Sequence, residues 1–367
     1  MSDRSDVIII GAGVVGCAVA ERLAGRGLEV LLLEALPREG MGLSSRNSGV
    51  VHSGLYYPQG SLKARACTEG RARLYAWCER QGVPFRRCGK LVLGVGSEGR
   101  EALEDLARNG RACGAEDLRM IGRSEAIALE PRLSRSPADH ALWCPHSGVV
   151  DAHGLTQSLK RVAVHRGVDV AFGALVGAVG LDGDGWRVET SRGEIRGTLL
   201  VNAAGLAADQ VARQAGLSGY VHRYSRGDYF RWHGAPVFER LVYPVRPQGS
   251  AGLGVHVTLE IDGGVRLGPD AKWVSRDEPT SPPDALEGVF RARAAGLLGE
   301  LEQGRLSWDG CGVRPKLFLE GGEAVDDFVV ARHEGRSWHL LGIESPGLTA
   351  ALALGSLVAQ EVVAANP

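Results

Sequence analysis

The sequence predicts an α/β fold of two interleaved domains, one Rossmann-like with a parallel sheet and one a β-rich α+β domain. Three observations predict it. An apolar run at 6–10 leads directly into a glycine-rich turn and a helical pattern, and a similar strand–turn–helix pattern returns at 338–364. Between them, residues 227–268 carry several short runs of β-branched and aromatic residues. We therefore expect both ends of the chain to build one domain.

The composition is that of an ordinary globular protein. The 367 residues are 44% hydrophobic and 23% charged, with a formal net charge of −1. This balance excludes a disordered chain and predicts no basic surface for nucleic acid. No uninterrupted apolar run is long enough to span a membrane, so we expect no transmembrane segment, while peripheral membrane contact stays open. Asp3 and Asp6 flank Arg4, which is unlike the positive start of a signal peptide.

The cysteines predict a reducing compartment. There are seven, an odd number, and they form no CxxC motif or regular framework. A reduced, cytoplasmic protein is the interpretation that fits this usage. Cys144 with His140 and His146 matches no familiar metal-ligand spacing, so we expect no metal site.

The first element pair indicates a dinucleotide site. Gly11–Gly16 (GAGVVG) follows the apolar strand, and Glu34 ends the next apolar run at 28–34. In this motif the glycines allow a tight turn, a close approach to pyrophosphate and close helix packing, while the acid accepts ribose hydroxyls and repels a 2′-phosphate. A glycine-rich turn without a ligand is the alternative. The candidate binding residues here are Gly11, Ala12, Gly13, Val14, Val15, Gly16, Glu34 and Ala35.

The remaining elements follow from periodicity and turn signals. Helices are expected at 14–26, 61–81 (ending near Gly82), 98–112, 152–166 and 284–302. Strands are expected at 90–95, 167–170, 174–179 and 198–202, with a hairpin at 182–185. The chain ends in a strand at 338–342, a turn at 343–347 and a helix at 348–364, for which Ser345 and Pro346 suit the first positions.

The pattern at the end of the chain favours a flavin over a nicotinamide. A nicotinamide-dependent dehydrogenase usually keeps its nucleotide half contiguous, whereas FAD is long enough to contact both ends of this chain. The loop at 42–57 also suits a pyrophosphate and the polar edge of a flavin, although a polar surface loop is the alternative. The further candidates for cofactor contact are Ser44, Ser45, Arg46, Asn47, Ser48, Val50, Val176, Ala203, Ala204, Gly205, Gly342, Glu344, Ser345, Pro346, Gly347, Leu348 and Thr349.

The segment Arg46–Ala64 resembles the signature of the L-2-hydroxyglutarate dehydrogenases and oxidases, flavoenzymes of the D-amino-acid oxidase superfamily. The resemblance continues through 145–151, 225–230, 243–245, 253–256, 261–270 and 312–314, and so covers nearly the whole chain. It implies non-covalent FAD and a two-domain fold of the GR2 type. It also implies oxidation of the carbon that carries the hydroxyl group of a small 2-hydroxy acid. The C-terminal loop at 343–349 departs from the pattern of that family.

Two kinds of side chain are needed for such an oxidation. Hydride transfer to flavin N5 requires a base for the hydroxyl proton, and an imidazole has a suitable pKa. His52 is the first candidate and His256 the second, and a structural histidine bonded to a backbone carbonyl is the alternative for His52. A base histidine favours hydroxy acids over amines. Tyr57 and Tyr243 could contribute hydroxyls or pack in the core.

The substrate carboxylate needs a cation. Arg314 resembles the carboxylate-binding arginine of the superfamily, and a surface arginine in an ion pair is the alternative. A second carboxylate would need a second cation, for which Lys63, Arg226 and Lys316 are available.

The sequence thus predicts an FAD-dependent oxidoreductase for a small 2-hydroxy acid, L-2-hydroxyglutarate or an analogue, that passes electrons to a quinone, another acceptor or oxygen. The alternatives are an amino-acid or secondary-amine oxidase and a non-catalytic FAD-binding subunit. We expect residues 1–85, 145–215 and 320–367 to form the FAD-binding domain, and 86–144 and 216–319 to form the substrate domain.

Overall fold

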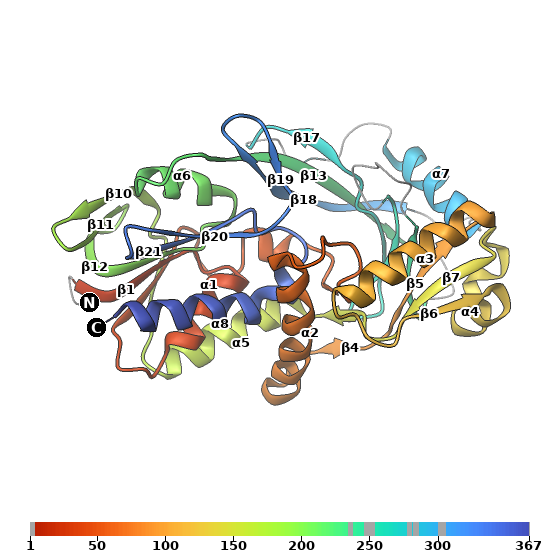
Figure 1. Cartoon of the computed structure of the whole chain (residues 1–367), viewed down its shortest axis with the longest axis horizontal. Helices are drawn as coiled ribbons and strands as arrows, with labels where there is room; N and C mark the ends of the chain where they lie inside the picture. Colours follow the sequence, from red (N-terminus) through yellow and green to blue (C-terminus); the bar gives the residue numbers. More distant parts are fainter. Residues whose placement is uncertain are drawn as a thin grey trace.

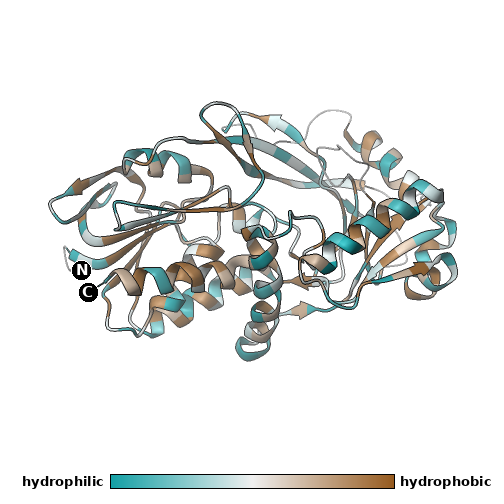
Figure 2. Ribbon diagram, in the orientation of Figure 1, coloured by the Kyte–Doolittle hydropathy of each residue, from teal (hydrophilic) through white to brown (hydrophobic). Residues whose placement is uncertain are grey.

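A computed structural model describes residues 4–233, 238–245, 254–276, 281, 286–299 and 306–366. The predicted α/β fold is confirmed: two large mixed sheets lie side by side and helices cover them (Figure 1). Each sheet has its own apolar core. Figure 2 shows apolar residues gathered in the strands and in the helices that cover them.

The first sheet has eight strands and a parallel centre. β1 pairs in parallel with β2 and β12, β2 pairs with β9, and β12 also pairs with β21 from the end of the chain. The strand predicted at the end of the chain is therefore present and lies in the same sheet as β1. The strands are β1 (Arg4–Ile10), β2 (Val30–Glu34), β9 (Asp169–Phe172), β10 (Val176–Asp182), β11 (Gly185–Thr190), β12 (Gly193–Asn202), β20 (Val329–His333) and β21 (Ser337–Leu341).

Helices α1 (Val14–Leu23), α2 (Leu62–Gln81), α5 (Ala152–His165) and α8 (Gly347–Ala365) form a layer with this sheet, and the short α6 (Ala208–Gln214) lies near β10 and β21. Small residues let this layer pack closely. A Cβ on Gly355 of α8 would lie 2.7 Å from the backbone of Ala18 in α1, and one on Gly70 of α2 would lie 2.3 Å from the Thr349 oxygen. Among the described residues, α8 is the helix long and apolar enough to cross a membrane, but it packs between α1 and α2 and is mostly buried.

The second sheet has ten strands and is mostly antiparallel. Its two longest strands, β13 and β18, pair from Tyr220↔Leu319 to Trp232↔Leu306. Helices α3 (Gly96–Ala112), α4 (Arg123–Leu129) and α7 (Leu286–Leu298) accompany this sheet. The strands are β5 (Lys90–Gly94), β6 (Arg119–Gly122), β7 (His140–Cys144), β13 (Tyr220–Trp232), β14 (Leu241–Pro244), β15 (Val257–Leu259), β16 (Val265–Leu267), β17 (Lys272–Val274), β18 (Leu306–Leu319) and β19 (Ala324–Val325).

A small third sheet joins the two parts, with β8 (Gly148–Val150) between β3 (Val50–Val51) and β4 (Phe85–Arg86). Most predicted elements are present with shifted ends. Helix α2 begins after Ser61, whose hydroxyl accepts from the Ala64 amide, and ends at Gly82, whose φ of 67° is left-handed. The predicted helix at 14–26 ends earlier, at Leu23. Of the helix predicted at 284–302, residues 284, 285 and 300–302 lie outside the described residues, as does Leu253.

One helix start was predicted wrongly. Pro346 is the residue before α8, and neither it nor Ser345 caps the helix with a side chain. The Ser345 hydroxyl instead forms a 3.2 Å hydrogen bond with Nε2 of His52. The sequence around α8 cannot show this contact, because it forms only when β3 and the loop after it bring His52 to the start of α8.

Candidate functional site

The glycine turn between β1 and α1 has no room for side chains. Gly11 has a φ of +103°, and a Cβ there would lie 2.5 Å from the Ala203 oxygen at the end of β12. A Cβ on Gly16 would lie 1.9 Å from the Gly11 oxygen. The turn is thus pressed between its own helix and the neighbouring parallel strand. This leaves the first amides of α1 at the carboxyl edge of the sheet, where an anion is favoured by the helix dipole.

Glu34 is tied to the same turn at the end of β2. Its Oε2 accepts from the Ala12 amide at 2.8 Å and its Oε1 from the Leu36 amide at 3.0 Å. Each carboxylate oxygen retains a further lone pair for a hydroxyl. Beside it, Leu36 and Leu175 are 38% and 60% exposed, although both are large and apolar. Both line the same cavity as Glu34, so they offer apolar contact to a flat ring next to the ribose position. Sequence analysis missed this pair, because nothing local distinguishes them from core leucines.

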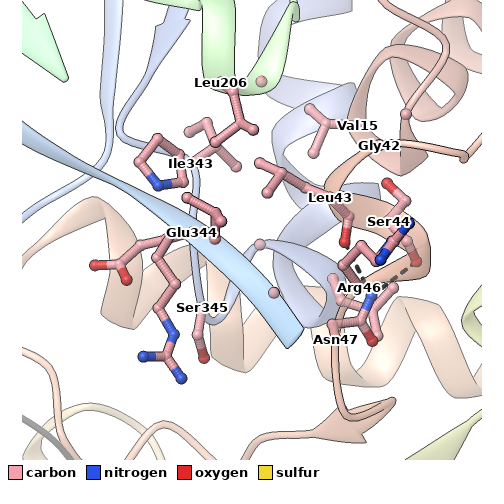
Figure 3. A pocket seen from close by; sticks show the side chains of 18 of the residues that line it. Val15, Gly42, Leu43, Ser44, Arg46, Asn47, Leu206, Ile343, Glu344 and Ser345 are labelled. Carbon is pink, nitrogen blue, oxygen red and sulfur yellow. Dashed lines mark hydrogen bonds between the residues drawn. The ribbon is translucent and has the colours of Figure 1, made fainter. Parts of the chain in front are cut away.

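A cavity of about 1050 Å³ extends from this turn to the second sheet. Figure 3 shows Glu344 and Ser345 on one side and Ser44 and Asn47 on the other. Five of the candidates for cofactor contact are not among the residues that line it: Ala12, Gly16, Ser45, Gly342 and Thr349. The other cofactor candidates and the candidates for the reaction, His52, Tyr243, His256 and Arg314, line it. These cofactor candidates are Gly11, Gly13, Val14, Val15, Glu34, Ala35, Ser44, Arg46, Asn47, Ser48, Val50, Val176, Ala203, Ala204, Gly205, Glu344, Ser345, Pro346, Gly347 and Leu348.

The loop at 42–48 lies across the start of α1. Ser44 Oγ accepts from the Val14 amide at 2.9 Å, while Asn47 Nδ2 donates to the Ser44 oxygen at 2.8 Å. Ser45 turns away and donates to the Met41 and Gly42 carbonyls. A Cβ on Gly312 would lie 2.2 Å from the Arg46 oxygen, so β18 also packs directly on this loop. The loop therefore joins the nucleotide turn to the second sheet.

The turn before α8 carries a buried ion cluster. Glu344, whose side chain is 6% exposed, takes Lys63 Nζ at 3.2 Å and Lys316 Nζ at 2.6 Å on the same Oε1. Burial alone would raise the pKa of Glu344, but Lys63 and Lys316 hold it below its usual value. The two lysines are therefore not free to hold a second substrate carboxylate.

His52 faces the cavity as an uncharged base. Its backbone amide donates to Thr349 Oγ1 at 3.1 Å, and its Nε2 contacts Ser345 Oγ at 3.2 Å. Its Nδ1 is buried and has no hydrogen-bond partner among the described residues. Burial, and then the charges of Lys90 and His256, hold the pKa of His52 well below its usual range. Within the described ranges no backbone carbonyl binds its ring, so the geometry differs from that of the structural alternative.

His256 has the geometry of a structural histidine. Its Nδ1 lies 2.8 Å from the Gly254 carbonyl oxygen, and its ring stacks on that of Tyr243 with centroids 3.8 Å apart. Burial lowers the pKa of His256 to about 3, against the opposing effect of the Gly254 bond, and Lys90 and Arg314 act in the same direction as burial. Tyr243 is buried and packs through this stack.

Arg314 lies in β18 opposite Ser225 of β13 and lines the cavity. Among the described residues no carboxylate forms an ion pair with it, unlike the surface arginine of the alternative interpretation. Arg226 is different: its Nε and Nη2 bind Asp228 at 2.9 and 2.7 Å, and it is absent from the cavity lining. Arg276 and Arg293 line the cavity instead, and no pattern in the sequence singled them out.

The polar groups of the cavity fit FAD better than a metal. In the part of the chain that is described, no group of three or more His, Cys, Asp or Glu side chains is placed to share a metal ion. His146 pairs with Asp117 at 2.8 Å, and all seven cysteines are unpaired and buried. A turn without side chains at the start of α1, the Glu34 carboxylate between apolar side chains, and a cavity that extends from there to the second sheet suit the pyrophosphate, the ribose and the flavin of FAD.

Comparison with known proteins gives the same result over the whole chain. The family model described as FAD dependent oxidoreductase matches residues 6–361. A mitochondrial L-2-hydroxyglutarate dehydrogenase of Arabidopsis thaliana is 35% identical, over 98% of this chain and 83% of the relative. An L-2-hydroxyglutarate dehydrogenase of Escherichia coli strain K12 is 28% identical, over 97% of this chain and 93% of the relative.

A solved structure extends the likeness to three dimensions. The dithionite-reduced L-alpha-glycerophosphate oxidase of Mycoplasma pneumoniae, with FAD bound, superposes with a TM-score of 0.87 at 26% identity. The match covers 99% of this chain and 94% of that one.

Proposed function

The chain belongs to the FAD dependent oxidoreductase family, and we propose that it oxidises the hydroxyl-bearing carbon of a small 2-hydroxy acid, L-2-hydroxyglutarate or a close analogue. One observation carries the proposal. An uncharged His52 and an Arg314 that has no carboxylate partner in the described part of the chain face the same cavity, which begins at the nucleotide turn. The names of the similar enzymes from Arabidopsis thaliana and Escherichia coli support the choice of substrate.

Each side chain has a distinct role in this proposal. Arg314 binds the carboxylate next to the reacting carbon, because a guanidinium can hold a planar carboxylate through two parallel hydrogen bonds. His52 accepts the hydroxyl proton, which its uncharged imidazole can do at neutral pH. FAD, when bound, supplies the acceptor for the hydride. Arg276 and Arg293 replace Lys63, Arg226 and Lys316 as candidates for a second carboxylate.

We also propose the domain division expected from the sequence, with FAD bound without a covalent link. Its support is the origin of the strands. The first sheet uses residues from 4–34, 169–202 and 329–341, and the second uses residues from 90–144 and 220–325. The short β19 (Ala324–Val325) pairs with β18, so the boundary near 320 moves past this strand. Unpaired, buried cysteines are compatible with the cytoplasm. A quinone, another acceptor or oxygen completes the cycle.

The proposal is tested by anaerobic reduction of the purified yellow protein. L-2-hydroxyglutarate should bleach the flavin absorbance faster than lactate, glycine, proline or sarcosine. If an amine proves the best reductant, the chain is instead an amino-acid or secondary-amine oxidase. If dithionite bleaches the flavin but no acid or amine does, the non-catalytic alternative holds.

A further inference from the structure

Lys90, the first residue of β5, is a buried cation that forms no ion pair with the described carboxylates. Its side chain has no solvent exposure, and among the described residues its Nζ has no hydrogen-bond partner. A buried ammonium is strongly destabilising unless other groups compensate for its lost hydration. An apolar residue of similar length would suit this position better if it served the fold alone.

The surroundings of Lys90 are aromatic rings and thiols. Its Nζ lies 4.5 Å from the centroid of the Tyr243 ring and 5.8 Å from that of the Tyr56 ring, within the range of cation–π contacts. Cys144 lies opposite it on β7, and Cys67 of α2 and Cys88 are also near enough to raise the pKa of Lys90 if they lose their protons. Burial raises the pKa of the Cys67 and Cys144 thiols to about 12 and raises that of Cys88 as well, so all three are uncharged at neutral pH.

Tyr243 stands between Lys90 and the cavity. Tyr243, Tyr56, His52 and His256 all line the cavity, whereas Lys90 does not. The Tyr243 ring is close to Lys90 and also stacks on His256 at 3.8 Å. Lys90 therefore lies directly behind the wall that carries both histidines, where low polarity strengthens its electrostatic effect.

We propose that Lys90 is a positioning residue: its ammonium, held against the Tyr243 ring by the cation–π contact, places a positive charge behind the cavity wall that carries His52 and the His256 ring stacked on Tyr243. This inference rests on the proposed role of His52 as the base. An imidazole accepts the hydroxyl proton only when it is uncharged. Burial already disfavours the charged form, and a cation behind the wall adds to this effect, so the imidazole stays uncharged down to a lower pH.

Electrostatics of the two histidines support this role. Burial is the largest cause of the lowered pKa of each, and Lys90 acts in the same direction on both. The other described groups that act on or contact His52 are His256, the Ser345 and Thr349 hydroxyls, and the Cys67 thiol, which donates to the His52 carbonyl. His256 also faces the Gly254 carbonyl, Tyr243 and Arg314. Burial also lowers the pKa of Lys90, so its effect is lost once the pH rises far enough to deprotonate it.

The test compares Lys90→Met with Lys90→Arg in the FAD-loaded protein. We expect Lys90→Met to raise the titration midpoints of His52 and His256, followed by NMR, by roughly one pH unit. The acid limb of flavin reduction should move upward by the same amount, while the rate at alkaline pH stays the same. Lys90→Arg should restore the wild-type limb. Lys272→Met removes the charge of an exposed lysine on β17 and serves as the control, which should move neither readout.

Thermal unfolding separates this role from a structural one. Lys90→Met should keep or raise Tm, because it removes a buried charge. Unchanged imidazole titrations in Lys90→Met would overturn the inference, and a lowered Tm with an unchanged acid limb would assign Lys90 to the fold. If the Met variant does not fold, Lys90→Leu takes its place. The titration needs no substrate, so a failure of every hydroxy acid to reduce the flavin would refute the proposed function and leave this test intact.

Discussion

Replacing Glu34 by alanine should weaken FAD binding by a calculable amount. The Glu34 carboxylate is oriented by two backbone amides, from Ala12 at 2.8 Å and Leu36 at 3.0 Å, and both bonds form without a ligand. What the substitution removes from binding is the acceptor for the ribose hydroxyls. A hydrogen bond to a charged group contributes about 1.5–3 kcal/mol. Since about 1.4 kcal/mol is a factor of ten, the loss of one such bond raises Kd about 10- to 150-fold.

The assay is a titration of apoprotein with FAD, followed by quenching of flavin fluorescence. Glu34→Gln keeps a neutral acceptor and should fall between the wild type and Glu34→Ala. Glu189→Ala removes an exposed carboxylate on β11 and should leave Kd unchanged. FMN lacks the adenosine, so its affinity should not respond to Glu34. A Kd for FAD within twofold of the wild type in Glu34→Ala would refute the assignment of the ribose site to this carboxylate.

Three further predictions concern the reaction and the response to pH. His52→Ala should slow flavin reduction by roughly 10²–10⁴-fold in stopped-flow measurements with FAD still bound, and a wild-type rate would make His256 the next candidate. Arg314→Lys should raise KM and also lower the limiting reduction rate, because an ammonium cannot hold both carboxylate oxygens through parallel hydrogen bonds. Unchanged values of both would exclude Arg314 as the carboxylate clamp. His256 and His339 have pKa values of about 3 and 4 in the folded protein, lowered mainly by burial. The unfolded chain therefore binds more protons below about pH 6.5, and the free energy of unfolding should fall by about 1.4 kcal/mol per pH unit for each histidine as the pH drops from there towards 4. Urea titrations at several pH values should show that the free energy of unfolding depends less steeply on pH in His256→Gln than in the wild type. An equally steep dependence would contradict a buried, uncharged His256.

The site was predictable from the sequence where its residues lie close together along the chain. Gly11, Gly13 and Gly16 with Glu34 define one turn between two strands, and its conformation depends on local sterics. Ser61 and Gly82 likewise bound α2, since a hydroxyl before a helix and a glycine after it satisfy the helix ends locally. These signals are present in any chain with the same spacing, so they could be interpreted before the tertiary structure was known.

Other features depend on which distant residues meet. Nothing in the sequence near Lys63 or Lys316 indicates that both form ion pairs with Glu344. Likewise, nothing near Arg226 indicates that it forms an ion pair with Asp228. These three cations therefore already have carboxylate partners, while Arg276 and Arg293, which line the cavity, were not singled out by the sequence. Ser345 was expected to begin a helix, but its hydroxyl instead contacts His52. No local signal indicates this contact, because His52 lies almost 300 positions away.

The amino-acid sequence by itself determined the α/β class, the dinucleotide turn and the flavin, and it singled out His52 and Arg314 as the candidate base and carboxylate clamp. Only the tertiary structure decided their state. It sets the His52 ring in the cavity wall, where desolvation and the charge of Lys90 disfavour the charged imidazole, and among the described residues it places no carboxylate in an ion pair with Arg314. The physical reason is that the type of a side chain fixes which reactions it can take part in. Its charge, and whether it is still available for a ligand, depend on exclusion of solvent and on neighbours that distant strands supply.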